Sequence, residues 1–237
     1  MKIGILCAIH PQESKVNWGG SPIDAYIRFF KSAGVPFEYQ GYEVAQGELP
    51  DSADECDYYV ITGSPRGVYD TDPWIEPLMQ FIRDGYLTGK KFVGICFGHQ
   101  VLAEALGGHV QKSEKGWGLG LKSFEINNRK DWMGAGADQC SLYFAHQDQV
   151  ITLPAGAELL GGNSFCPNGM YVVDGRVLGI QGHPEFDLPI MQSILENAKS
   201  GDDQARALVA ETAVLSLDNG QPDNQIVARW IVDFLNQ

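Results

Sequence analysis

The sequence has no segment that could cross a membrane as a helix. A membrane-spanning helix needs roughly 20 consecutive apolar residues, and no run in this chain approaches that length. The N-terminal run IGILCAI, residues 3–9, is also too short for the apolar part of a signal peptide. It predicts a buried first strand instead.

The cysteine pattern offers neither a disulfide framework nor a zinc site. The five cysteines are odd in number, widely spaced and without a C-x-x-C motif. Free thiols are typical of a reducing compartment, so we expect a cytoplasmic protein without a bound metal. The phosphate-binding motif G-x-x-x-x-G-K-[ST] is missing too, so the chain is not expected to activate an acceptor with ATP.

Basic residues are scarce. Lys and Arg total 17 against 30 Asp and Glu, which gives a formal net charge of -13 and a pI of about 4.7. An acidic surface repels nucleic-acid phosphates and anionic lipids, so neither nucleic acid nor a membrane is an expected partner. No low-complexity segment, repeat or linker interrupts the chain, and we expect a single domain over residues 1–237.

Short apolar runs alternate with helical patterns in the first part of the chain. Expected strands cover residues 2–9, 37–44, 57–61 and 91–95. Expected helices begin after Ser21-Pro22 and Asp72-Pro73 and end at Gly34 and Gly85, and a third covers residues 97–106. Such alternation is typical of a doubly wound α/β fold, a mostly parallel sheet with helices on both faces.

After residue 108 the pattern changes to short runs that alternate in polarity and are interrupted by glycine. The clearest is MYVVDGRVLGI, residues 170–180, where Asp174-Gly175 is a two-residue turn signal between apolar runs and predicts a hairpin. The C-terminal part returns to helical patterns. We therefore expect a small antiparallel region beside the parallel sheet.

The stretch GICFGHQ, residues 94–100, places a cysteine where an expected strand meets an expected helix. Gly94 and Gly98 flank Cys96 in a G-x-nucleophile-x-G arrangement, which allows a tight turn and the close approach of a substrate. The start of the helix favours a thiolate, and the N–H of Phe97 could serve an oxyanion. The alternative is a small buried cysteine at a strand end, which is our interpretation of the other four.

A thiolate nucleophile needs a histidine base and a group that orients this base. His183 is the best candidate because it follows the apolar run VLGI and precedes Pro184 and Glu185. In an extended segment, residues i and i+2 lie on the same side, so Glu185 could hold one ring nitrogen of His183. His146, which also follows an expected strand, is an intermediate candidate. The histidines expected to be structural are His10, His99 and His109.

Together these motifs resemble the class I, triad-type glutamine amidotransferases. GICFGHQ is followed by HPE at residues 183–185, and the blocks ITGSPRGVYD (61–70) and FAHQDQV (144–150) support the match. The last block is similar to the Ser-His-x-Asp block of the GMP-synthase-type amidotransferase domain, with Ala145 in place of Ser. The resemblance covers most of the chain and implies a flavodoxin-like, class I glutamine amidotransferase-like fold.

The resemblance also implies a role for each matching residue. Cys96 would attack the side-chain amide of glutamine, His183 would move the proton, and Glu185 would orient His183. The implied oxyanion hole consists of backbone N–H groups of Gly63, Ser64 and Phe97, although the family usually has Gly-Gly-Pro where this chain has Gly-Ser-Pro. The implied substrate-binding residues are Gln100, Ala145, His146 and Gln147. The implied reaction, hydrolysis through a γ-glutamyl thioester, needs neither a metal nor an organic cofactor.

Three interpretations of the function remain open, and the first two have a small-molecule substrate, either glutamine or another γ-glutamyl amide. The chain could be a glutaminase that releases ammonia, with a possible synthetase partner subunit that would use this ammonia. It could be a γ-glutamyl hydrolase or peptidase acting on another γ-glutamyl amide, or a binding or regulatory module without activity. The intact Cys96, His183, Glu185 and Gln100 disfavour the last. Residues 10–26, which contain Trp18, follow the first strand and are predicted to wall the pocket, with an ordinary surface loop as the alternative.

Overall fold

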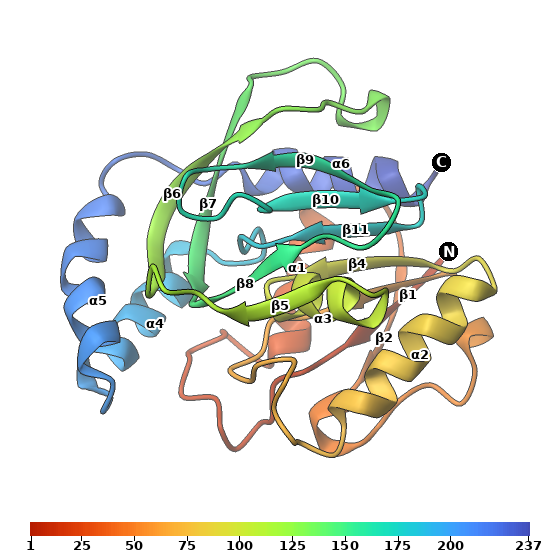
Figure 1. Ribbon diagram of the computed structural model, residues 1–237, viewed down its shortest axis with the longest axis horizontal. Coiled ribbons are helices and arrows are strands. Elements are labelled where there is room, and N and C mark those ends of the chain that lie inside the picture. Colours follow the sequence, from red (N-terminus) through yellow and green to blue (C-terminus); the bar gives the residue numbers. More distant parts are fainter.

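One mixed sheet of nine strands organises the protein, as the computed structural model of residues 1–237 shows (Figure 1). Its parallel strands are β1 (Lys2–Leu6), β2 (Glu38–Tyr42), β3 (Tyr58–Ile61), β4 (Lys91–Ile95) and β11 (Val177–Ile180). They lie in the order β2-β1-β3-β4-β11. This is the flavodoxin-like order, and it confirms the doubly wound fold predicted from the sequence.

Antiparallel strands extend the same sheet beyond β11. They are β10 (Met170–Val173), β9 (Ala157–Gly162), β6 (Gly118–Ile126) and β7 (Gln139–His146), in that order. The antiparallel region that the sequence predicted is therefore continuous with the main sheet. A separate pair is formed by β5 (His109–Lys112) and β8 (Asp148–Thr152). The predicted hairpin turn is confirmed, because Asp174 and Gly175 have φ angles of 48° and 63°.

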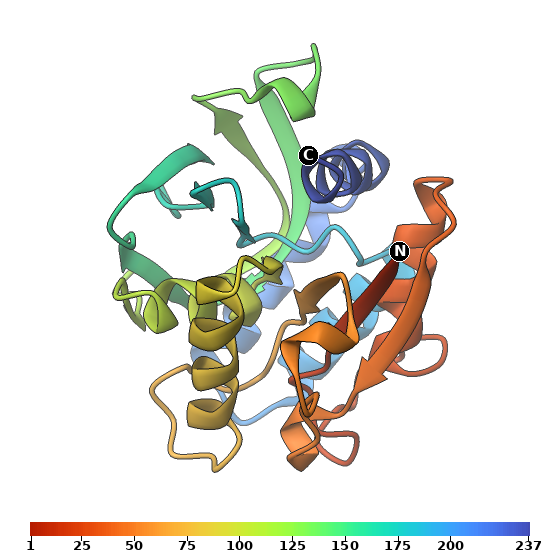
Figure 2. The same cartoon turned by 90° about the vertical axis from the view of Figure 1, so that its right-hand side faces the viewer.

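Helices cover both faces of the sheet (Figure 2). On one face lie α1 (Pro22–Ser32) and α6 (Asn224–Leu235), and on the other α2 (Ile75–Leu87) and α3 (Phe97–Ala105). Beside β6, α4 (Leu188–Ser200) packs against α5 (Gln204–Ser216). Short 3-10 helices cover Val44–Gln46, Ala53–Glu55 and Asp131–Met133. No helix combines the length and the apolar character that a bilayer span requires.

Burial on both faces explains why the parallel strands β1, β3, β4 and β11 are nearly continuous apolar runs in the sequence, unlike the edge strand β2. Ile3 and Ile5 of β1 belong to the cluster that includes α1 and α6, whereas Leu6 belongs to the cluster around α2 and α3. Each buried side chain of this size contributes about 1.5–3 kcal/mol to stability. The two clusters fix the parallel strands so that the loops after β1, β3, β4 and β11 leave the sheet at one edge, where α/β proteins bind ligands.

The start of α1 follows its local signal, and the start of α2 does not. Ser21 caps α1 as predicted, because its hydroxyl accepts the N–H of Asp24 at 3.1 Å. The predicted cap at Asp72 is wrong. The helix begins at Ile75, and the Asp72 carboxylate forms an ion pair with Arg66 at 3.4 Å instead. The Asp72 side chain therefore makes a tertiary contact with Arg66 and does not cap the helix as the sequence pattern predicted.

Gly85 lies inside α2 and does not end it, contrary to the prediction. A Cβ at this position would lie 2.7 Å from Cζ of Phe92, so glycine is needed for the close packing of α2 on β4. The helix continues to Leu87, and Gly89, with a φ of 87°, makes the turn that follows. In the sequence, a glycine required for packing could not be distinguished from one that ends a helix.

Candidate active site

Cys96 occupies the turn between β4 and α3 in a backbone conformation that residues with side chains rarely adopt. Its φ is 54° and its ψ is -104°. Such a conformation costs about 1–3 kcal/mol and persists only where the surrounding structure fixes it. Here the N–H of Cys96 donates to the carbonyl of Ile180 at 2.9 Å, and its own carbonyl accepts the N–H of Gln100 at 3.0 Å. The thiol is therefore held at the N-terminus of a helix, where the sequence placed it.

Glycine is required on both sides of Cys96 because backbone segments approach each other closely. A Cβ at Gly94 would lie 2.3 Å from the carbonyl oxygen of Gly98. A Cβ at Gly98 would lie 2.2 Å from the carbonyl oxygen of Ile61 in β3. No side-chain rotation could relieve these clashes, since the atoms belong to the backbone. The two glycines allow α3 to begin directly against β3 and β4.

Replacing Gly98 with alanine is expected to destabilise the fold strongly. The added methyl group must displace the backbone of β3, so the free energy of unfolding should fall by at least about 2–3 kcal/mol in chemical denaturation. Gly136→Ala is the matched control, because its Cβ would meet only the Arg129 guanidinium, at 3.7 Å. A change below about 0.5 kcal/mol is expected for the control. Equal effects of the two substitutions would contradict the close approach at Gly98.

His183 follows β11 and is fixed through both its backbone and its ring. Its N–H donates to the carbonyl of Tyr143 at 2.8 Å, and the Phe186 ring stacks on the imidazole with ring centroids 3.8 Å apart. Nδ1 of His183 lies 2.8 Å from Oε1 of Glu185. The i, i+2 spacing therefore brings the two side chains together as the sequence predicted. Nε2 of His183 is buried and has no hydrogen-bond partner in the protein.

Tyr26, on α1, links Glu185 to the loop that follows β3. Its hydroxyl donates to Oε1 of Glu185 at 3.0 Å and accepts the N–H of Gly63 at 3.1 Å. The Tyr26 side chain is only 1% exposed, so these polar groups depend on one another and not on water. No sequence signal pointed to Tyr26 as part of the site. Glu185 lies 159 residues away along the chain, and only the fold brings the two together.

Cys96 and His183 face the same glycine. A Cβ at Gly63 would lie 3.0 Å from Cε1 of His183 and 3.7 Å from Cβ of Cys96. Burial by itself lowers the pKa of His183, but the charge of Glu185 and then that of Cys96 outweigh burial and raise this pKa to about 10. The balance favours a protonated imidazole at neutral pH.

Two of the three predicted oxyanion-hole residues have a backbone N–H that is available to a ligand. Phe97 is the first residue of α3, where helix geometry leaves the N–H without an acceptor in the helix. The N–H of Ser64 makes no backbone hydrogen bond in its loop. The N–H of Gly63 is already bonded to the hydroxyl of Tyr26. Gly63 therefore contributes its lack of a side chain, which leaves room for His183, and Ser64 is the donor that the loop can offer.

The predicted substrate-binding residues line one hollow beside Cys96. This hollow measures about 410 Å³, and its wall includes Gln100, Ala145, His146 and Gln147. The side-chain amide of Gln100 donates to the carbonyl of Asp148 at 2.9 Å and to Oε1 of Gln181 at 3.1 Å. These two bonds fix the orientation of the Gln100 amide, so the hollow has a rigid polar wall. We call this hollow the first hollow.

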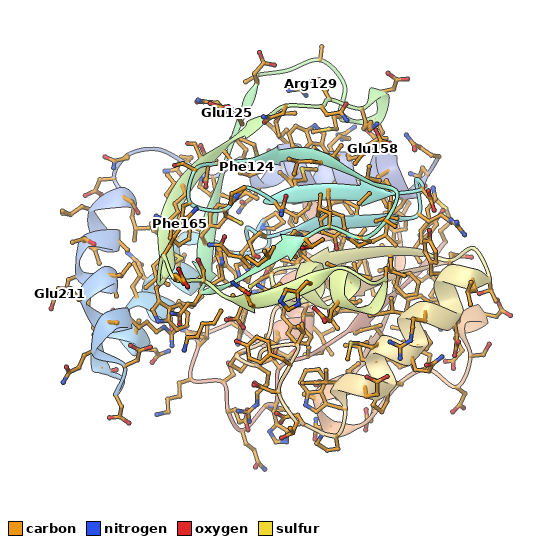
Figure 3. The ribbon with its side chains drawn as sticks, in the orientation of Figure 1. Phe124, Glu125, Arg129, Glu158, Phe165 and Glu211 are labelled. Carbon is orange, nitrogen blue, oxygen red and sulfur yellow. The ribbon has the colours of Figure 1, made fainter.

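His146 lies in the wall of the first hollow but lacks the partner that His183 has. Its Nδ1 lies 3.0 Å from the carbonyl of Asp148, and burial lowers its pKa to about 4. Phe165, labelled in Figure 3, packs edge-on against the ring with centroids 5.8 Å apart. Because no carboxylate orients it and it remains neutral, His146 is a weaker candidate for the base than His183.

A second hollow meets the first at Cys96. It measures about 330 Å³, and its wall joins Cys96, His183 and Glu185 to the loop after β1, namely Glu13, Ser14, Lys15, Val16 and Trp18. Trp18 donates its indole N–H to Oγ of Ser14 at 2.7 Å and packs edge-on against Phe186, with centroids 5.8 Å apart. The prediction that residues 10–26 wall the pocket is confirmed.

Neither hollow is lined by the other cysteines or by the histidines predicted to be structural. All five cysteines are free and buried. His99 is 0% exposed, its ring centroid lies 4.9 Å from that of Tyr171, and burial lowers its pKa to about 3. It is therefore a neutral core residue. No group of three or more His, Cys, Asp or Glu side chains is arranged to hold a metal ion.

Comparison with known proteins agrees with this architecture. Residues 16–199 match the profile of the family described as glutamine amidotransferase class-I. The chain is 30% identical over 232 residues to γ-glutamyl peptidase 3 of Arabidopsis thaliana, with 93% of this chain and 90% of the relative covered. It is 28% identical over 191 residues to a glutamine-hydrolysing GMP synthase of Azoarcus sp., which covers 76% of this chain but 29% of the synthase.

A solved structure shows the same fold over nearly the whole chain. The glutamine amidotransferase of Thermotoga maritima superposes with a TM-score of 0.76 at 19% identity, covering 99% of this chain and 98% of that one. Three findings point to the same family: the sequence motifs around Cys96 and His183, the order of the strands, and the match over residues 16–199. The chain belongs to the class I glutamine amidotransferase family.

Proposed function

We propose that the protein hydrolyses γ-glutamyl amides through a thioester on Cys96. The observation that carries this proposal is the arrangement of His183, whose Nδ1 is held by Glu185 while its buried Nε2 has no partner. The thiol of Cys96 lies beside it at the start of α3. Acyl transfer requires a nucleophile with an oriented base beside it, and here the nucleophile also lies at a helix N-terminus.

In the first half of the reaction, Nε2 of His183 already carries the proton that the thiol of Cys96 has given up, because the raised pKa keeps the ring protonated. Sγ of Cys96 then forms a bond with the side-chain carbonyl carbon of the γ-glutamyl group. The carbonyl oxygen becomes an oxyanion, which the N–H groups of Ser64 and Phe97 stabilise. Collapse of this intermediate breaks the carbon–nitrogen bond, and His183 gives its proton to the departing amine. The γ-glutamyl group remains on sulfur as a thioester.

In the second half, water takes the place of the amine. His183 accepts a proton from the water, and the resulting hydroxide adds to the thioester carbon. Collapse breaks the carbon–sulfur bond and releases glutamate, and the proton stays on His183 for the next cycle. One γ-glutamyl amide and one water thus give one glutamate and one amine, and the chain's own residues perform every proton transfer.

The second hollow favours an amine larger than ammonia. Glutamine needs space for its glutamyl part, which the first hollow offers with Gln100 in its wall. The second hollow, of about 330 Å³, would then face nothing but the departing ammonia. A γ-glutamyl peptide would occupy both. The relative matched over 90% of its length is named a γ-glutamyl peptidase, which supports the same choice. Glutamine hydrolysis for a synthetase partner is the second candidate. The family match supports recognition of a glutamyl group, and glutamine and γ-glutamyl peptides share this group.

Glutamate release tests the proposal. The purified protein is incubated separately with glutamine and with γ-glutamyl dipeptides, and free glutamate is measured. We expect Cys96-dependent release from at least one dipeptide, at a higher kcat/KM than from glutamine. Release from glutamine alone would favour the glutaminase interpretation with a synthetase partner. Release from neither, by a protein that a glutamine-analogue electrophile leaves unlabelled at Cys96, would refute the hydrolase and favour a binding module.

Replacing Tyr26 with phenylalanine is expected to lower kcat about 3- to 10-fold, since one hydrogen bond to the Glu185 carboxylate is lost. The N–H of Gly63 also loses its acceptor, so the free energy of unfolding should fall by about 1–3 kcal/mol. Steady-state kinetics and denaturation measure the two effects. Tyr39→Phe is the control, because the hydroxyl of Tyr39 is buried and makes no hydrogen bond. Equal behaviour of both variants would contradict the positioning of Glu185 by Tyr26.

A further inference from the structure

Arg206, near the start of α5, borders both hollows and has no acidic partner. It lies in the wall of the first hollow with Gln100 and in the wall of the second with Trp18. Its Nε is buried and makes no hydrogen bond in the protein. The side chain is only partly exposed, and leaving a partly buried charge unpaired is unfavourable. The chain has 30 acidic residues that could have paired with it. An unpaired guanidinium at this place therefore suggests a ligand that supplies the missing anion.

The surroundings of Arg206 hold the guanidinium without neutralising it. Its Cζ lies 4.7 Å from the ring centroid of Trp117. The nearby Asp203 uses its two carboxylate oxygens elsewhere: Oδ1 accepts the backbone N–H of Arg206 at 2.9 Å, and Oδ2 accepts the indole N–H of Trp117 at 3.0 Å. Glu211, on the same helix, projects outward to solvent (Figure 3). The N–H donors of the Arg206 guanidinium therefore remain available to a ligand in the two hollows.

The charges of the two hollows differ. In the first hollow, the carboxylates of Asp70 and Asp148 offset the charges of Lys112 and Arg206. The remaining cation of that wall, Arg66, is paired with Glu13. In the second hollow, Glu13 is already paired with Arg66 at 2.6 Å, and Glu185 is bonded to His183. The charged side chains without an ion-pair partner in the second hollow are Lys15 and Arg206. The side of Cys96 that would receive the amine half of a substrate is therefore the more positive one.

We propose that Arg206 binds a carboxylate on the amine half of the substrate, so that γ-glutamyl peptides with a free carboxylate are preferred. This inference rests on the proposed hydrolysis of γ-glutamyl amides. A guanidinium can engage both oxygens of a carboxylate at once, and such charged hydrogen bonds are about twice as strong as neutral ones. Glutamine offers no carboxylate on that side. Its α-carboxylate belongs to the glutamyl half and is the other possible anion for Arg206.

Three substrates distinguish the two carboxylates. γ-Glutamylglycine carries a carboxylate on both halves, whereas γ-glutamylglycinamide and glutamine carry one on the glutamyl half only. In Arg206→Gln, the ratio of kcat/KM for γ-glutamylglycine to kcat/KM for γ-glutamylglycinamide is expected to fall roughly 10- to 100-fold. Arg206→Lys, which retains the charge but not the fork, should restore part of the ratio. Arg229→Gln is the control, because it makes the same change of charge on the exposed side of α6.

The ratio in each variant decides the inference. A ratio that falls in Arg206→Gln and is maintained in Arg229→Gln supports the carboxylate site. Equal losses on all three substrates would overturn it, because Arg206 would then serve the glutamyl half or the fold. An unchanged ratio in Arg206→Gln would overturn it as well.

Binding to the Cys96→Ala protein separates this inference from the hydrolase proposal. Calorimetry of that protein should show tighter binding of γ-glutamylglycine than of γ-glutamylglycinamide, and the difference should vanish when Arg206→Gln is added. If that preference is present while the wild type hydrolyses nothing, the hydrolase proposal fails and the carboxylate site stands. If the wild type hydrolyses all three substrates and no preference is found, the hydrolase stands and the carboxylate site fails.

Discussion

Replacing Cys96 with alanine is expected to lower kcat for glutamate release by at least about 10⁴-fold, because the acyl acceptor itself is removed. A coupled glutamate assay measures the loss, and denaturation shows whether the variant retains the stability of the fold. Relief of the positive φ at Cys96 is not expected, since alanine also has a Cβ. The variant should therefore be folded and inactive.

Cys140→Ala is the matched control for this substitution. The thiol of Cys140 is 1% exposed in β7, and burial raises its pKa, so it is an inert core side chain. We expect some loss of stability from the cavity but a kcat close to that of the wild type. Wild-type turnover by Cys96→Ala, or a loss of turnover in Cys140→Ala as large as that in Cys96→Ala, would contradict the assignment of the nucleophile.

The second large effect concerns the base. His183→Ala is expected to lower kcat by about 10²- to 10⁴-fold, the range in which positioned proton transfer contributes to catalysis. His146→Ala is the comparison, because this ring also borders the cleft but has only the carbonyl of Asp148 as its partner. Its effect should be smaller and should appear mainly in KM. Near wild-type turnover by His183→Ala together with an inactive His146→Ala would reverse the assignment.

The pH dependence of the wild type gives an independent check on His183. Because its pKa is raised to about 10 by the charges of Glu185 and Cys96, the ring remains protonated through neutral pH in the free enzyme. The alkaline limb of kcat/KM should therefore lie well above the ordinary histidine pKa, and activity should fall as the pH rises through the raised pKa, when the proton for the leaving amine is lost. In His183→Ala this limb should disappear.

Local sequence signals were sufficient for the parts of the site that belong to one segment. Gly94 and Gly98 predicted the tight turn at Cys96, and the structure shows that a Cβ at either position would meet backbone within 2.3 Å. The i, i+2 spacing predicted the contact between His183 and Glu185, because an extended segment dictates which side chains share a side. The position of residues 10–26 after the first strand predicted a wall of the pocket.

Contacts between distant segments could not be predicted in this way. Tyr26 lies on the buried face of α1, and nothing in the helical pattern separates a tyrosine that packs from one that bonds to Glu185. The same tyrosine accepts the N–H of Gly63. Of the two donors expected in this loop, Gly63 and Ser64, only Ser64 therefore remains available to an oxyanion. No sequence signal singled out Arg206, and its place beside both hollows depends on how α5 packs beside β6.

The ends of α2 show the same limit for secondary structure. The acid at position 72 and the glycine at position 85 match the local signals for a helix start and stop, yet both serve tertiary contacts. The class of fold was predictable because alternation of strands and helices leaves few topologies. The continuation of the sheet through β10, β9, β6 and β7 was not, because antiparallel pairing partners cannot be read from short alternating runs.

The most direct test of the central claim is the mass of the protein during turnover. Acid quenching of the wild type during hydrolysis of a γ-glutamyl dipeptide, followed by peptide mapping, should show one γ-glutamyl group on the peptide that contains Cys96. The same experiment on Cys96→Ala should show no adduct and no turnover. Full turnover by Cys96→Ala, or an adduct on a different residue of the wild type, would contradict a thioester mechanism at Cys96.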